Sequence, residues 1–258
     1  MDKMKKLANN LLYMDTHDSL VQVFRAWRLW FVGAMLGALI AAGVYWVFPP
    51  EWRARAVVVV DFNIEEYYPV PPGKQFYFLG REARKLQELA FSDETLQLVA
   101  DQLNGVTVQD LREDILSLSQ PEDGAWHFFA DSRDAAQAEK IAGIWAETFY
   151  QQVLDGIEIS AVLEEYRAEI VRLMEENPDM SSGEINYLAT QLVPEINKSM
   201  SITPYLELTL SQVNNLKIER NVPLSVYVLS GSVIGACGLA IATLMFLRKE
   251  ELDAFLVE

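Results

Sequence analysis

The chain has 258 residues, 51% of them hydrophobic, one cysteine and a formal net charge of −16. Residues 51–222 hold 30 Asp or Glu against 14 Lys or Arg, whereas the flanking regions balance at 7 against 7. An acidic middle region argues against nucleic acid and against an anionic lipid surface as its partners. We interpret the acidity as a means of keeping that region soluble rather than as a cation site.

An uncharged run of twenty residues, 29–48, follows an N-terminal segment of residues 1–28. At 1.5 Å per residue it would form about 30 Å of helix, which matches the hydrocarbon core of a bilayer. The ends of the run carry aromatic residues suited to the headgroup level, namely Trp27, Trp30, Tyr45 and Trp46. Pro49 and Pro50 would end the helix. The run predicts a transmembrane helix, and it is longer than a cleaved signal peptide requires.

A second uncharged run, residues 223–247, precedes Arg248 and Lys249. Further basic residues precede the first run: Lys3, Lys5, Lys6, Arg25 and Arg28. By the positive-inside rule both termini are cytoplasmic, including a tail of residues 248–258. Residues 49–222 then form an extracytoplasmic, or periplasmic, domain of a two-pass inner-membrane protein. Cys237 lies in the second run, so this domain would have no disulfide and would depend on its core and on oligomerisation.

The first half of the domain mixes strand and helix signals. Four valines at residues 57–60 predict a strand buried on both faces. The proline-rich and aromatic stretch 64–80 predicts irregular structure, because Pro69, Pro71 and Pro72 exclude regular elements. Apolar spacing predicts helices over residues 81–90 and 93–103, the second capped by Ser92 and ended by Gly105. A capped helical turn follows at residues 107–114.

The second half contains the longest pattern. The pattern predicts two strands, at residues 115–119 and 126–130, that are separated by a turn. Three/four apolar spacing without proline predicts a long helix over about residues 132–176, which Gly156 could weaken. A return helix over 181–198, bent at Pro194, and a half-buried strand over 206–210 complete the domain. The fold class is therefore α+β, with a small sheet, a long helical hairpin and two flanking transmembrane helices. Since the first and last strands each lead to a span, we expect them to be neighbours.

The sequence offers no catalytic constellation, so we expect no enzyme, no cofactor and no metal. His17 and His127 would lie on opposite sides of the membrane. Cysteine and histidine are not clustered at metal-ligand spacing, and no phosphate-binding G-x-x-x-x-G-K-[ST] loop is present. Carboxylate pairs such as Glu65 with Glu66 are typical of a solvated surface.

Small residues are spaced for helix packing in both apolar runs. The first run has Gly33 and Gly37 in a GxxxG arrangement, and the second has Gly231 and Gly235, followed by Gly238. Such spacing lets helix backbones approach closely in lipid. We predict that these glycines pack the spans together, either within one chain or between chains.

Three stretches are similar to the polysaccharide co-polymerase family, the Wzz-type chain-length determinants. Residues 20–28 resemble the family's lead-in to its first span. Trp52, Ala54 and Ala56 resemble the family's aromatic-x-Ala-x-Ala entry into its first strand. Residues 131–142 resemble the start of its long helix, and the similarity continues at Ala146, Phe149 and Tyr150. Pro223 corresponds to its proline-rich approach to the second span. Since only residues 248–258 follow that span, we expect the class without a fused kinase.

The resemblance implies a non-catalytic, homo-oligomeric ring that regulates the chain length or export of a surface polysaccharide, with a membrane polymerase or exporter as its partner. Trp145, Phe149 and Tyr150 are candidates for contacts between protomers. The glycan itself could be a further partner. Alternative functions are an adaptor that activates a separate cytoplasmic tyrosine kinase, an extracytoplasmic sensor, or an accessory subunit of another membrane complex.

Overall fold

The computed structural model describes residues 27–63, 75–119, 124–177, 181–200 and 202–257. The basic residues from Lys3 to Arg25, which support the predicted topology, therefore lie outside the described residues, as do Pro69, Pro71 and Pro72. The chain divides into two compact units. One contains the two apolar helices, and the other runs from Glu51 to Asn221.

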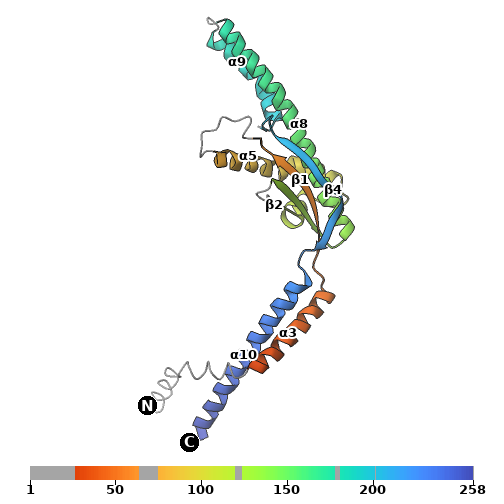
Figure 1. Cartoon of the computed structure of the whole chain (residues 1–258), viewed down its shortest axis with the longest axis vertical. Coiled ribbons are helices and arrows are strands. Elements are labelled where there is room, and N and C mark those ends of the chain that lie inside the picture. The colour runs from red at the N-terminus through yellow and green to blue at the C-terminus, as the bar shows by residue number, and fades with distance from the viewer. Residues whose placement is uncertain (1–26, 64–74, 120–123, 178–180, 201, 258) are drawn as a thin grey trace, which may run out of the picture. The chain divides into compact units, whose positions relative to one another are not determined.

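The first unit pairs helix α3 (Trp27–Val47) with helix α10 (Leu224–Val257), which lie side by side (Figure 1). All of α3 and the Leu224–Thr243 part of α10 are long and apolar enough to cross a membrane, which fits a two-pass membrane protein. Helix α10 continues through the predicted tail to Val257. The tail has neither proline nor glycine to end the helix.

The second unit is built on a four-stranded antiparallel sheet in the order β2-β3-β1-β4. Its strands are β1 (Trp52–Asp61), β2 (Leu116–Ser119), β3 (Ala125–Ser132) and β4 (Glu207–Arg220). The first and last strands are paired neighbours, as predicted from their connections to the spans. The predicted α+β class is therefore confirmed.

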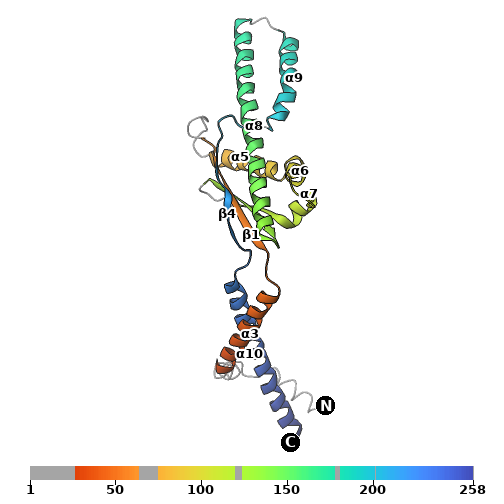
Figure 2. The same cartoon turned by 90° about the vertical axis from the view of Figure 1, so that its right-hand side faces the viewer.

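Burial alternates along β1, so the prediction that both faces are buried was wrong. Ala54, Ala56, Val58 and Val60 are buried, whereas Val57 and Val59 are only half-buried. Helix α8 (Ala135–Glu176) packs across β1, β3 and β4 (Figure 2). A continuous run of valines is compatible with a strand covered on one face or on two, because valine favours strands in either setting.

Helix α8 is continuous over 42 residues and begins after Asp134, whose side chain accepts a hydrogen bond from the Ala136 N–H at 3.0 Å. Gly156 does not interrupt the helix. A Cβ at Gly156 would lie 2.6 Å from Ile202 Cδ1, and one at Gly143 would lie 3.1 Å from the Val213 carbonyl oxygen. Both glycines therefore allow close approach of another segment, which is a packing role rather than a kink.

The return helix α9 (Ser182–Lys198) runs beside the C-terminal half of α8 (Figure 2). Pro194 lies inside this helix, as predicted. Together α8 and α9 form the expected helical hairpin.

The remaining helices are α5 (Gln75–Ala90), α6 (Asp93–Asp101) and α7 (Val108–Asp110), followed by the π-helical turn η1 (Leu111–Ile115). Irregular structure was predicted as far as residue 80, but α5 already begins at Gln75, because no proline follows Pro72 until Pro121. Ser92 caps α6 as predicted. Gly105 does not end that helix directly and instead occupies the following turn, with a φ of +74°.

An aromatic cluster fills the space between α8 and the sheet. The Phe128 ring lies 4.8 Å from that of Trp145 and 5.0 Å from that of Phe149, between ring centroids. All three side chains are fully buried. The Trp145 indole N–H donates to the Ala90 carbonyl oxygen at 2.9 Å, so this core also fixes the end of α5.

Candidate functional site

The GxxxG glycines of the two apolar helices face one another within a single chain. A Cβ added at Gly33 would lie 2.6 Å from the Gly235 carbonyl oxygen, and one added at Gly37 would overlap the Gly231 carbonyl oxygen. Since a side chain at either position would meet backbone atoms of the other helix, the glycines set how closely α3 and α10 approach. Their contact is intramolecular.

Other positions on the same helices lie outside this contact. A Cβ at Gly238 would have no atom within 4 Å, so the structure does not place Gly238 with the four packing glycines. Gly43 on α3 is equally open. The Cys237 side chain is exposed. A second contact between the helices is the edge-to-face pair of Tyr45 and Tyr227, with centroids 5.3 Å apart.

A polar cluster ties three segments together where β1 begins and β4 ends. Arg53 donates from Nε and Nη2 to the two carboxylate oxygens of Asp131 at 2.7 and 2.6 Å. Asn221 Nδ2 donates to Asp131 Oδ2 at 2.8 Å. The hydrogen bond to Asp131 raises the pKa of Arg53, burial lowers it, and the attraction to the same carboxylate raises it further. The pair is bidentate, which fixes its orientation as well as its strength.

The residues of the predicted strand-entry motif surround this cluster. The Trp52 ring lies under the Arg220 guanidinium, whose carbon is 3.6 Å from the ring centroid. The Asn221 N–H donates to the Glu51 carbonyl oxygen at 2.8 Å and thereby extends the β1–β4 pairing. Ala54 and Ala56 are fully buried on the face that α8 covers. Pro223 is exposed.

Two of the three predicted contact residues between protomers lie in the core of the domain. Trp145 and Phe149 are fully buried in the core of their own chain, so neither side chain is accessible to a second protomer. Tyr150 is half-buried and packs at the margin of the same core. The aromatic spacing on α8 thus marks its sheet-facing side.

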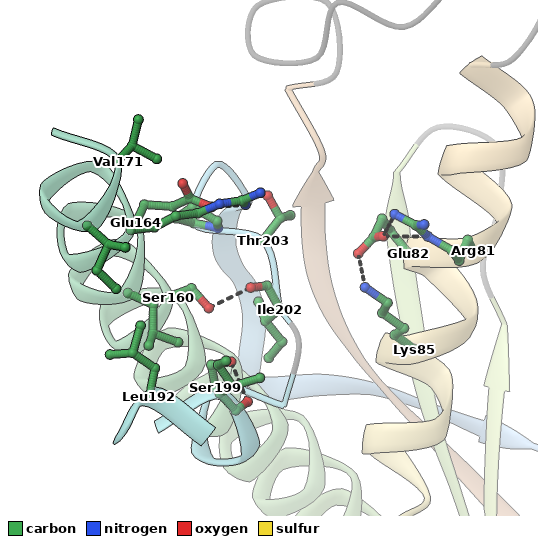
Figure 3. A pocket seen from close by; sticks show the side chains of 15 residues that line it. Arg81, Glu82, Lys85, Ser160, Glu164, Val171, Leu192, Ser199, Ile202 and Thr203 are labelled. Atoms are coloured by element: carbon green, nitrogen blue, oxygen red, sulfur yellow. Dashed lines mark hydrogen bonds and ion pairs between the residues drawn. The ribbon is translucent and has the colours of Figure 1, made fainter. Parts of the chain in front are cut away.

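A pocket of about 480 Å³ lies between α5 and the root of the α8–α9 hairpin (Figure 3). Glu82 is buried in its wall and accepts hydrogen bonds from Arg81 Nε at 3.0 Å and Lys85 Nζ at 3.1 Å. On the opposite wall Ser160 Oγ donates to the Ile202 carbonyl oxygen at 2.6 Å. The pocket has no signature in the sequence, because its walls come from segments distant in the chain.

The described residues contain no group of three or more His, Cys, Asp or Glu side chains that could hold a metal ion. His127 is a half-buried strand residue whose ring stacks on Phe129, with centroids 5.9 Å apart. One Glu164 carboxylate oxygen lies 3.6 Å from Arg167 Nη1 in an exposed ion pair. None of these arrangements places a nucleophile beside a base.

Neither a protein-family model nor a curated protein sequence matches this chain. Among solved structures, the chain is similar to one described as a full-length bacterial polysaccharide co-polymerase. The match covers 89% of this chain and 97% of that chain, with 13% sequence identity and a TM-score of 0.29.

Proposed function

We propose that this protein is a non-catalytic membrane scaffold that regulates the chain length or export of a surface polysaccharide. The scaffold is a homo-oligomer and acts with a membrane polymerase or exporter. The observation that carries the proposal is the connection of the domain to the two apolar helices. Strands β1 and β4 are paired neighbours, and each is joined by a short link to one of two helices that are themselves packed together.

This connection suits a scaffold because it closes the domain with non-covalent contacts at the point where the chain enters and leaves it. Arg53, Asp131 and Asn221 join β1, β3 and the end of β4 there. Glycine contacts then hold α3 against α10. The long helix α8 extends beyond the sheet with a largely exposed C-terminal half, which offers surface for contacts with other chains. The resemblance of residues 52–56 and 131–142 to the co-polymerase family supports the same function.

In the topology that goes with this proposal, both termini are cytoplasmic and residues 49–222 are extracytoplasmic in the inner membrane. The acidic domain faces the compartment in which surface polymer is assembled. Its charge keeps it soluble and would repel an anionic glycan.

The direct test is the size distribution of surface or secreted polysaccharide in a strain that lacks the gene. The proposal predicts that polymer is still made but loses its preferred length, and that the intact gene restores it. An unchanged distribution would contradict length control. The protein mass of the full chain purified in lipid nanodiscs tests self-association separately. A homo-oligomer gives at least twice the chain mass of 29.3 kDa, whereas a monomer gives that mass once.

A second candidate function is supported by the C-terminal helix. Helix α10 continues for 14 residues past its apolar part, which ends at Thr243, and reaches Val257. A helical cytoplasmic extension of that kind could dock a separate tyrosine kinase, as an adaptor would. Removal of residues 248–258 distinguishes the two functions, because an adaptor would lose its kinase partner in co-purification whereas a length-setting scaffold would keep its self-association.

A further inference from the structure

We propose that the pocket between α5 and the α8–α9 hairpin binds a small organic anion with an apolar body. This site goes beyond the proposed function and does not depend on it. A volume of about 480 Å³ is within the range of small-molecule sites, which is roughly 300–1,000 Å³. The pocket lies wholly within the unit Glu51–Asn221.

The charge of the pocket is the first reason for an anionic ligand. Its lining contains three cations, Arg81, Lys85 and Arg167, against two carboxylates, Glu82 and Glu164. Residues 51–222 as a whole carry about twice as many acidic as basic residues. A lining with an excess of cations is therefore contrary to the composition of the domain around it, and it favours an anion.

The geometry of the cations leaves room for a ligand. Arg81 turns its Nε and Nη2 toward a single oxygen of Glu82, at 3.0 and 2.9 Å. This contact uses one edge of a planar group that has five N–H donors. Arg167 is only loosely paired, with 3.6 Å between its Nη1 and the nearest oxygen of Glu164, and 76% of its side chain is exposed. The face of the Arg81 guanidinium also packs on the Phe78 ring, with 4.9 Å from its carbon to the ring centroid, so its outer edge is the part that faces a ligand. Each guanidinium group therefore keeps N–H donors that suit an incoming carboxylate or phosphate.

The wall that faces α5 would bind the apolar body of the ligand. It is built from aliphatic residues of α8 and α9 and of the segment after α9: Leu163, Ile170, Leu192, Ile196 and Ile202. The hydroxyls on this wall are already used internally, since Ser160 donates to Ile202 and Ser199 donates to the Ile196 carbonyl oxygen at 2.8 Å. The pocket thus has apolar surface on the side of the hairpin and cations on the side of α5, as Figure 3 shows for Leu192 and Arg81.

The test is calorimetric titration of the full chain in phosphatidylcholine nanodiscs with hexyl phosphate, with empty discs as the blank. Inorganic phosphate, which lacks the tail, should bind at least tenfold more weakly, and hexyltrimethylammonium, which reverses the charge, should not bind. Arg81→Gln and Arg167→Gln should each weaken hexyl phosphate at least fivefold. Arg84→Gln, an exposed change on α5 outside the pocket, should leave the affinity unchanged.

Arg81→Gln removes a partner of the buried Glu82 and could therefore disturb the fold. Arg167→Gln avoids this problem, because the exposed Arg167 side chain contributes little to folding. Absence of hexyl phosphate binding to the wild-type chain would overturn the proposal. Equal binding by the wild-type chain and Arg167→Gln, or equal binding of the cationic probe, would also overturn it.

Discussion

Asp131 accepts two hydrogen bonds from Arg53, although 78 residues separate them in the sequence. Asp131 also accepts a hydrogen bond from Asn221, the last residue of the domain, and only 11% of its side chain is exposed. One carboxylate thus links the strand that enters the domain with the segment that leaves it. A half-buried bidentate pair of this kind contributes more than an exposed one, because removing one partner leaves the other poorly solvated.

We therefore expect Asp131→Ala to lower the free energy of unfolding by about 2 kcal/mol. The measurement is urea unfolding of the full chain in nanodiscs, followed by tryptophan fluorescence. Lys198→Ala is the matched control, since its ion pair with Glu195 is exposed and should change stability by less than about 0.5 kcal/mol. Equal effects of the two substitutions would show that the Asp131 cluster does not hold the domain together.

Substitution of the packing glycines should separate the two apolar helices. Gly37→Ile would drive a branched side chain into the Gly231 backbone and should cost about 1–3 kcal/mol. Gly43→Ile on the same helix meets open space and should be tolerated. The readout is the fraction of detergent-solubilised chain that stays monodisperse after heating. Comparable losses for both variants would exclude the intramolecular glycine contact.

Gly156→Ala should destabilise the root of the helical hairpin, although alanine favours a helix. Its Cβ would lie 2.6 Å from Ile202 Cδ1 and 3.2 Å from the Ser199 carbonyl oxygen. Gly80→Ala, in open space on α5, is the control and should stabilise by up to about 1 kcal/mol. We expect opposite signs in thermal unfolding. A stabilising Gly156→Ala would mean that the segment after α9 does not approach α8 this closely.

Trp145→Phe distinguishes a core residue from a contact between protomers. The change leaves the buried Ala90 carbonyl oxygen without its hydrogen bond and should cost about 2 kcal/mol in unfolding free energy. The mass of the assembly, measured by light scattering, should stay that of the wild type. Tyr166→Phe, at an exposed position on α8, controls for loss of a polar group. A smaller assembly with unchanged protomer stability would instead make Trp145 an interface residue.

The turn that carries α7 should be sensitive to acid. Hydrogen bonds from the Thr107 hydroxyl and then from the Thr107 N–H hold the pKa of Asp110 below its ordinary value of 3.8, against a small opposing effect of burial. A carboxylate with a lowered pKa stabilises the fold above its unfolded pKa, and that contribution is lost as the pH falls through the folded value. The protection factors for amide exchange at residues 107–111, which are corrected for the intrinsic pH dependence of exchange, should therefore fall below about pH 3.8 in the wild type. Asp110→Asn should abolish this pH dependence, and persistence of the dependence in the variant would assign it to another group.

Local patterns predicted the elements of this fold better than their long-range contacts. The three/four spacing of residues 138–153 located the buried side of α8, and the connections of the first and last strands predicted their pairing. The same aromatic spacing could not say whether α8 buries that side against its own sheet or against a second chain. Trp145 was therefore predicted as a contact between protomers, and the structure buries it under its own sheet.

The polar cluster and the pocket could not be predicted in the same way. Arg53, Asp131 and Asn221 meet only because the sheet order places β1 between β3 and β4. Glu82 lines a pocket whose opposite wall comes from residues more than 70 positions away in the sequence. By contrast, the GxxxG spacing of both apolar runs did indicate where the two helices would touch, because it depends only on local periodicity.

The most direct test of the scaffold proposal is the modal chain length of the surface polysaccharide, resolved on a gel, in a deletion strain that carries either an empty vector or the intact gene. Total polymer is measured in parallel. The proposal predicts a broad, unregulated distribution without the gene, a restored modal length with it, and equal total polymer in both strains. The same modal length with and without the gene would contradict the proposal that this protein regulates polysaccharide length.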